Sequence, residues 1–181
     1  MEEKIIAFLK RHGIPFERVE HPPVYTSAQS GSYLLNAPGE EGKNLFLSDK
    51  KGRRFFLVLS LERKRVDLKS LGELLDAPKL KFASEERLQE LMGVTSGAVD
   101  ALALINDLQG KVELVVDADL WTNDHIRSHP LVNTATLILS RADMQRFFEL
   151  TAHKATILRL PEPPADGAEP PNAAVRGSDQ L

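Results

Sequence analysis

Residues 43–59 read KNLFLSDKKGRRFFLVL. Two apolar runs, 45–47 and 55–59, flank a polar link that ends in Gly52. Short apolar runs on either side of a Gly-containing link are typical of a β-hairpin. This stretch therefore predicts two antiparallel strands, over 43–48 and 53–59, joined by a tight turn.

Helices and further strands are predicted on both sides of this hairpin from capping residues and apolar periodicity. The expected helices cover 2–12, 26–35 starting at a Thr26 capping box, 68–75 after Asp67, 85–92 after Ser84, and 141–150 after Ser140. The expected strands cover 14–21, 80–82, 102–105, 111–116, 133–139 and 155–160, whereas 117–128 is expected to be loop or short helix. Because the strongest connections are hairpins, including 106–110, this order predicts a mixed α/β fold with a largely antiparallel central sheet and surrounding helices.

Composition bounds the class of protein. The chain has 181 residues, a formal net charge of -3 and no Cys, which excludes disulfides, a thiolate nucleophile and Cys-ligated metals. Residues 1–160 are expected to form one domain, and 161–181, rich in Pro, Ala and acidic residues, a disordered tail. The N-terminus has neither a signal peptide nor a membrane span, so a cytoplasmic protein without membrane contact is expected.

Basic residues concentrate in one segment of this acidic chain. Between residues 43 and 69 there are nine Lys or Arg against three Asp or Glu. Such a segment favours an anion-binding surface. The alternative is a solvated hairpin and helix face, on which exposed cations discourage edge-to-edge strand pairing.

Few residues suggest chemistry by themselves. The fingerprints of P-loops, dinucleotide folds, serine hydrolases and zinc proteases do not occur. His125 and His129, near Asp124, could hold a metal only on a helix, which Pro130 disfavours, so no metal and no cofactor are expected. Lys43 opens a strand and could hold a carbonyl oxygen or a phosphate as a point charge, although lysines at strand starts are usually structural.

Seven segments together carry a family resemblance. They are GIPF at 13–16, HPPVYT at 21–26, KNLFL at 43–47, KRVDL at 64–68, FAS at 82–84, LIND at 104–107 and HPLVNTAT at 129–136. In order and spacing, over about residues 2–160, the chain resembles the YbaK-like, ProX-type aminoacyl-tRNA deacylases, relatives of the editing domain of bacterial prolyl-tRNA synthetases. The KNLFL segment is more similar to the alanyl-tRNA(Pro) branch (ProXp-ala, or PrdX) than to the cysteinyl branch.

The resemblance implies hydrolysis of the ester that joins a wrong amino acid, alanine in the first place, to the 3′ end of tRNA(Pro). It implies the YbaK fold, a catalytic role for Lys43, and prolyl-tRNA synthetase as a further partner, with no DNA involved. The substrate-binding residues it implies are Asn44, Gly97, Ala98, Val99, His129 and Asn133. With this function, the tRNA acceptor end is expected to contact Lys50, Lys51, Arg53, Arg54, Lys64 and Arg65.

Some positions leave alternatives open. The family's Gly-x-x-x-Pro loop falls at 97–101, with Ala101 in place of Pro, and Ser96 stands where relatives often have Pro. A deacylase for Ser or Cys, or a non-catalytic module that binds tRNA or a synthetase, are therefore alternatives. In the expected mechanism, Lys43 orients the ribose, the phosphate or the carbonyl group of the substrate, and N–H groups near Gly97 bind the oxyanion. The substrate's own 2′-OH assists the attacking water. His129 is either a general base or part of the pocket wall.

Overall fold

The computed structural model describes residues 1–24 and 32–164. Its helices are α1 (Glu2–Arg11), α3 (Leu68–Leu74), α4 (Glu85–Met92) and α5 (Arg141–Leu150), with 3-10 turns η1 (Ser96–Ala98), η2 (Ala101–Asn106) and η3 (Leu120–Thr122). Its strands are β1 (Glu17–Glu20), β2 (Glu40–Ser48), β3 (Phe55–Leu61), β4 (Lys81–Phe82), β5 (Val112–Asp117), β6 (His125–Ser128), β7 (Ala135–Ser140) and β8 (Thr156–Leu158).

The strands form one mixed sheet in the order β1-β7-β6-β2-β3-β5-β8, with β4 added to the end of β2. The pairs β1–β7, β6–β7, β2–β3 and β2–β4 are antiparallel. The pairs β2–β6, β3–β5 and β5–β8 are parallel. The predicted mixed α/β class and the hairpin at its centre are both confirmed.

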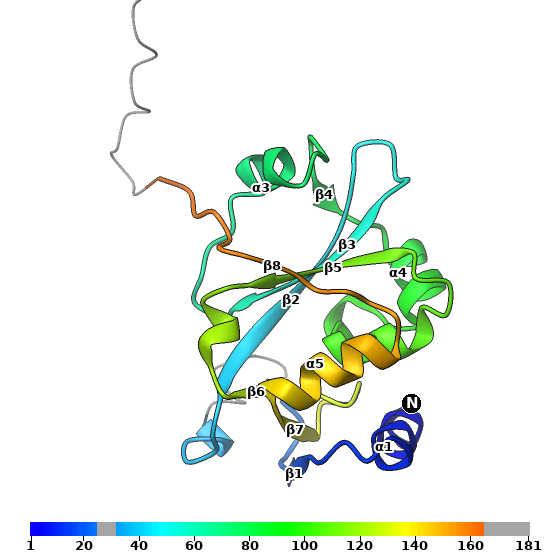
Figure 1. Ribbon diagram of the computed structural model, residues 1–181, viewed down its shortest axis with the longest axis vertical. Coiled ribbons are helices and arrows are strands. Elements are labelled where there is room, and N and C mark those ends of the chain that lie inside the picture. The colour runs from blue at the N-terminus through cyan, green and yellow to red at the C-terminus, as the bar shows by residue number, and fades with distance from the viewer. Residues whose placement is uncertain (25–31, 165–181) are drawn as a thin grey trace, which may run out of the picture.

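Strand β3 is buried along its whole length because both faces of the sheet are covered. Phe55, Leu57 and Leu59 face the larger core, to which α1, α4 and α5 contribute. Phe56 and Val58 face a smaller core beneath α3. Figure 1 shows α3 and the hairpin turn at the same end of the molecule, and α1 and α5 toward the other end. Burial on both faces explains the continuous apolar run, which an exposed antiparallel strand would not have.

Three predicted helix starts are confirmed by their caps. The side chain of Asp67 accepts a hydrogen bond from the N–H of Lys69 at 3.0 Å, and Ser140 Oγ accepts one from Asp143 N at 3.0 Å. Ser84 caps α4 in the same way, and Gly93 ends it with a φ of 66°. Leu74, near the end of α3, is 62% exposed although it is apolar.

Two segments differ from the prediction. Residues 102–105 form the 3-10 turn η2 rather than a strand, so β5 has no hairpin partner there and pairs with β3 in parallel. A short apolar run has no readable period, and here Asp100 caps it as a helical turn. Residues 125–128, expected as loop or helix, form strand β6.

Two predictions concern residues at the limits of the structure. The helix expected from Thr26 begins outside the described residues, although Ser32 and Tyr33 are helical. The tail expected to be disordered lies outside them from residue 165. Its first residue contacts the domain, because the carbonyl of Pro161 accepts a hydrogen bond from Asp67 N at 2.8 Å. No helix in the described part of the chain is long and apolar enough to cross a membrane.

Candidate active site

A cleft of about 650 Å³ opens where four parts of the chain meet. These are the start of β2, the η1 loop, the end of β6 with the loop after it, and the start of β7. The lining comprises His21, Val24, Leu34, Gly42, Lys43, Asn44, Glu62, Thr95, Gly97, Ala98, Val99, Asp100, Arg127, Ser128, His129, Leu131, Val132, Asn133, Ala135 and Thr136.

Every residue for which the resemblance implies catalysis or substrate binding lines this one cleft. They come from three stretches far apart in the sequence, and the structure brings them together: Lys43, Asn44, Gly97, Ala98, Val99, His129 and Asn133. The cleft lies where β2 pairs with β6 and where the chain leaves β6 for β7. The structure thus places these seven residues in one cleft, whereas their roles in catalysis and substrate binding remain predictions.

Lys43 is half-buried on β2, opposite Ser60 of β3 in the sheet register. Its Nζ donates to the carbonyl of Glu62 at 3.0 Å. This contact leaves two of the three ammonium donors for other partners. A positive charge held by a central strand can therefore meet an anion or a carbonyl oxygen in the cleft.

Asp100 is a cleft residue that the sequence did not reveal as one. It is 2% exposed, and its Oδ2 accepts a hydrogen bond from the N–H of His129 at 3.1 Å. Its Oδ1 accepts one from Leu102 N at 2.9 Å. The only sequence signal was local: an Asp before a buried apolar run is a capping pattern.

Arg127 and His21 also support the cleft and were not predicted. The Arg127 guanidinium donates to the carbonyls of Leu34, Ala37 and Pro38, which holds the loop before β2 against β6. The His21 ring lies between the Pro22 carbonyl at 2.9 Å and Thr136 Oγ1 at 3.1 Å. Both depend on contacts distant in sequence, which a local pattern does not show.

The predicted tRNA contacts lie in several places. Lys50, Lys51 and Arg53 are exposed at the hairpin turn, at the opposite end of β2 from Lys43. Arg65 is exposed after β3. Arg54 is engaged, because its guanidinium donates to both carboxylate oxygens of Glu113 at 2.7 Å and to two carbonyls after α3. The hydrogen bond with Glu113 raises the pKa of Arg54.

Lys64 is not available to tRNA, contrary to the expectation. Its side chain is 4% exposed, and Nζ donates to Asp117 Oδ1 at 2.9 Å and to Asp119 Oδ2 at 2.8 Å. Burial acts to lower the pKa of the ammonium, but the hydrogen bonds to Asp119 and Asp117 outweigh it and raise that pKa. Lys64 is thus a buried structural cation rather than a surface residue.

Among residues 1–24 and 32–164, no group of three or more His, Cys, Asp or Glu side chains is placed so that it could hold a metal ion. His125 lies on β6, and His129 follows that strand. The two histidines therefore do not have the helical spacing that two ligands on one face would need.

Comparisons with known proteins agree with this arrangement. The model of the aminoacyl-tRNA editing domain family matches residues 21–147. The prolyl-tRNA editing protein ProX of Acetoanaerobium sticklandii is 34% identical over 159 residues, which span 88% of this chain and 97% of ProX. Prolyl-tRNA synthetase associated domain-containing protein 1 of Danio rerio is 38% identical over 160 residues, 87% of this chain and 86% of that one.

A solved structure shares the fold. A candidate trans-editing enzyme for prolyl tRNA synthetase superposes with a TM-score of 0.68 at 20% identity, over 87% of this chain and 96% of that one. The family match covers the cleft from His21 to the helix after β7, and the relatives match almost end to end. The chain therefore belongs to the aminoacyl-tRNA editing domain family and is an aminoacyl-tRNA deacylase, a hydrolase.

Proposed function

We propose that this protein hydrolyses mischarged tRNA(Pro), with Ala-tRNA(Pro) as its main substrate, and releases alanine and free tRNA. The observation that carries the proposal is the convergence of Lys43 and Asn44 with the Gly97 and His129 loops in one cleft. Similarity to the prolyl-tRNA editing protein ProX supports tRNA(Pro) as the tRNA. Such an enzyme would act in the cytoplasm, where prolyl-tRNA synthetase is a natural partner.

The chemistry requires a water to attack the ester carbonyl and a donor for the oxyanion that develops. Lys43 supplies a positive charge at the cleft wall. The N–H groups of Ser96 and Ala98 are already bonded, to Glu85 Oε1 and to Thr95 O, each at 2.9 Å. The N–H of Gly97 is thus the main-chain donor we assign to the oxyanion. The 2′-OH of the terminal ribose would assist the water, since the chain has no Cys and no serine elbow.

Amino-acid choice would depend on the apolar wall that Val99, Leu131 and Val132 provide. A small pocket excludes the proline ring by size. A difference of one small group gives only about 1–3 kcal/mol of discrimination. Serine and cysteine esters are therefore the competing substrates, and a deacylase for either is the alternative proposal.

Glycine at position 97 has no explanation within the protein itself. A Cβ built on Gly97 meets no atom of the described residues within 4 Å, and the residue does not have a positive φ. We expect Gly97→Val to keep the wild-type unfolding temperature but to lower kcat/KM for Ala-tRNA(Pro) about 10- to 100-fold, the effect of about 1–3 kcal/mol of overpacking. Thermal unfolding and deacylation rates check this. Unchanged kcat/KM would mean that substrate does not approach Gly97.

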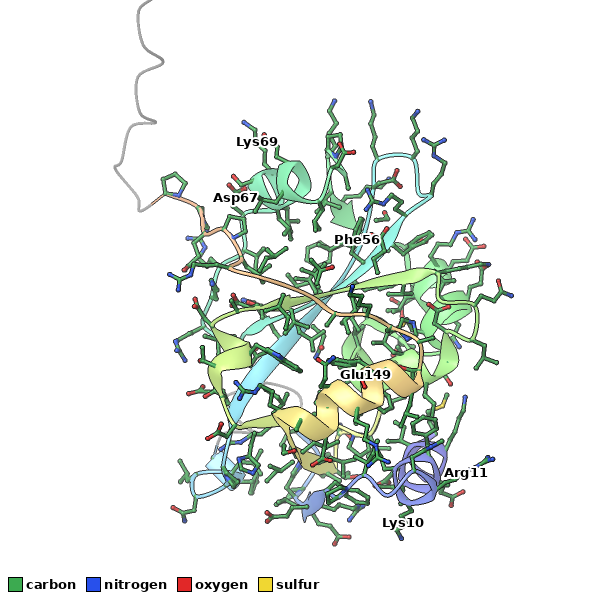
Figure 2. All side chains as sticks on the ribbon, in the orientation of Figure 1. Lys10, Arg11, Phe56, Asp67, Lys69 and Glu149 are labelled. Carbon is green, nitrogen blue, oxygen red and sulfur yellow. The ribbon has the colours of Figure 1, made fainter. Side chains whose placement is uncertain are left out.

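The tRNA body would contact a surface that we name the basic edge: Lys50, Lys51, Arg53 and Lys81. Lys81 of β4 pairs with Ser48, which places it beside the hairpin. Lys69 projects from α3 at the same end of the molecule (Figure 2). Lys50 lies seven positions after Lys43, beyond the five further residues of extended β2, so the two are separated by roughly 20 Å. The single-stranded 3′ end would thus occupy the cleft while the duplex stem lies along the basic edge.

Removing charge from the basic edge should weaken the salt dependence of deacylation. Each phosphate contact contributes about 0.9 to the slope of log affinity against log salt. We expect the variant with Lys50, Lys51 and Arg53 all changed to Ala to lower that slope, measured on 1/KM, by about 2–3. Lys10→Ala, exposed on α1 away from the hairpin (Figure 2), is the control. A slope equal to that of wild type would place the tRNA elsewhere.

Deacylation of four purified substrates tests the proposal: Ala-, Pro-, Ser- and Cys-tRNA(Pro). Rapid loss of alanine, with proline retained, is the expected result. Faster loss of serine or cysteine would change the amino acid assigned to the substrate and leave the proposed mechanism unchanged. No loss from any of the four would favour a module that binds tRNA or a synthetase without catalysis.

A further inference from the structure

Asp100 joins two walls of the cleft through one carboxylate. Oδ1 accepts the N–H of Leu102, at the start of η2, at 2.9 Å. Oδ2 accepts the N–H of His129, in the loop after β6, at 3.1 Å. The ring of His129 lies over the same oxygen, with Nε2 at 3.8 Å. No other side chain in residues 1–24 and 32–164 is hydrogen-bonded to the main chain of both the η2 turn and the 129–133 loop.

Burying the carboxylate of Asp100 costs free energy that hydrogen-bond donors must offset. The Asp100 side chain is 3% exposed, and a buried carboxylate is costly unless donors surround it. Its two main-chain donors come from segments 27 residues apart, Leu102 and His129. The carboxylate thus holds in place both the loop that carries Gly97 and the loop that carries His129.

We propose that Asp100 is a positioning residue that sets the separation of these two walls and thereby the selectivity of the cleft for a small aminoacyl group. The inference rests on the proposed deacylase function. Gly97, Ala98 and Val99 precede Asp100 directly, so a shift of Asp100 moves the wall they form. His129 moves with it, because its main chain and its ring both face Oδ2.

The two oxygens of Asp100 allow the positioning role to be separated from simple capping. Ser is as good an N-cap as Asp, and its shorter side chain can accept from Leu102 N but does not extend to His129. Asp100→Ser therefore keeps the cap and removes the connection between the walls. Asp100→Ala removes both. Asp100→Asn keeps the shape of the side chain but has one acceptor in place of two.

The experiment measures kcat and KM on Ala- and Ser-tRNA(Pro), together with thermal unfolding, for wild type and the three variants. We expect Asp100→Ser to unfold at a higher temperature than Asp100→Ala, because the cap is retained. We expect both to lose about 10- to 100-fold in kcat on Ala-tRNA(Pro), the effect of a misplaced catalytic geometry. The preference for Ala-tRNA(Pro) over Ser-tRNA(Pro) should fall in both Asp100→Ser and Asp100→Ala. The isosteric Asp100→Asn, which is the least disruptive to folding, should show the same loss of kcat and of preference.

Three other results have distinct meanings. If Asp100→Ser recovers wild-type kcat and selectivity in step with its stability, Asp100 is only a helix cap and the inference is wrong. If Asp100→Ser and Asp100→Ala do not fold, wild-type kinetics in Asp100→Asn overturn it equally. A wild-type protein inactive on every aminoacyl-tRNA contradicts the proposed function instead, so the two failures are distinguishable.

Discussion

Replacing Lys43 with Ala should lower kcat for Ala-tRNA(Pro) deacylation about 100- to 1000-fold, the loss typical of one donor to an oxyanion. The half-buried ammonium lies in the cleft, and among residues 1–24 and 32–164 its hydrogen-bond partner is the Glu62 carbonyl at 3.0 Å. Because this contact is a single side-chain to main-chain hydrogen bond, the variant should lose at most about 1–2 kcal/mol of stability. Single-turnover deacylation and thermal unfolding measure the two effects separately.

Two further variants sharpen the Lys43 experiment. Lys10→Ala removes an exposed lysine of α1 outside the cleft, and it should keep wild-type turnover. Lys43→Arg keeps the charge but exchanges a compact ammonium for a planar guanidinium, so it should recover little activity if the position of the charge matters. A Lys43→Ala protein with near wild-type kcat would remove Lys43 from the mechanism.

The local part of this fold was readable from sequence. The hairpin around Gly52, the caps at Asp67, Ser84 and Ser140, and the αL end of α4 all depend on residues within a few positions of one another. The resemblance likewise named the residues that meet in the cleft. Their convergence required the sheet order, in which β6 pairs with β2 in parallel.

The parts that sequence did not predict depend on distant partners. Strand β6 has a mixed pattern because Ile126 and Ser128 face inward while Arg127 reaches across to the carbonyls before β2. The apolar run at 102–105 became a 3-10 turn because Asp100 caps it. Lys64 lies in a basic segment that reads as surface, and its burial becomes visible only through its two carboxylate partners, at the end of β5 and two residues beyond it.

Lys64→Met should therefore reduce stability by about 3–5 kcal/mol, the cost of removing one partner of a buried ion pair. Asp117 is fully buried, and within the described part of the chain its Oδ2 already has no hydrogen-bond partner. Without the ammonium, the contacts that remain to Oδ1 from the described residues would be the long ones from Leu160 N at 3.3 Å and Asp119 N at 3.4 Å. Chemical denaturation of both proteins measures the difference in free energy of unfolding.

The stability difference between wild type and Lys64→Met should also depend on pH, in a direction that the raised pKa of Lys64 sets. A cation with a raised pKa in the folded state stabilises fully below its ordinary value of 10.5 and progressively less as pH rises through the folded value. The difference should thus be constant near neutral pH and should narrow above about pH 10.5. A difference that stays the same at alkaline pH would show that lost packing, rather than lost charge, destabilises the variant.

Two comparisons separate the buried charge from tRNA binding. Lys69→Ala removes an exposed cation of the same basic segment and should leave stability within about 0.5 kcal/mol of wild type. Combining Lys64→Met with Asp117→Asn removes the unpaired charge yet keeps an oxygen for the Leu160 N–H, so it should recover part of the lost stability.

If Lys64→Met instead weakened the salt dependence of deacylation and left stability unchanged, Lys64 would be a tRNA contact after all. The carboxylates of Asp117 and Asp119 make the opposite result the expected one, because they already hold the ammonium inside the protein.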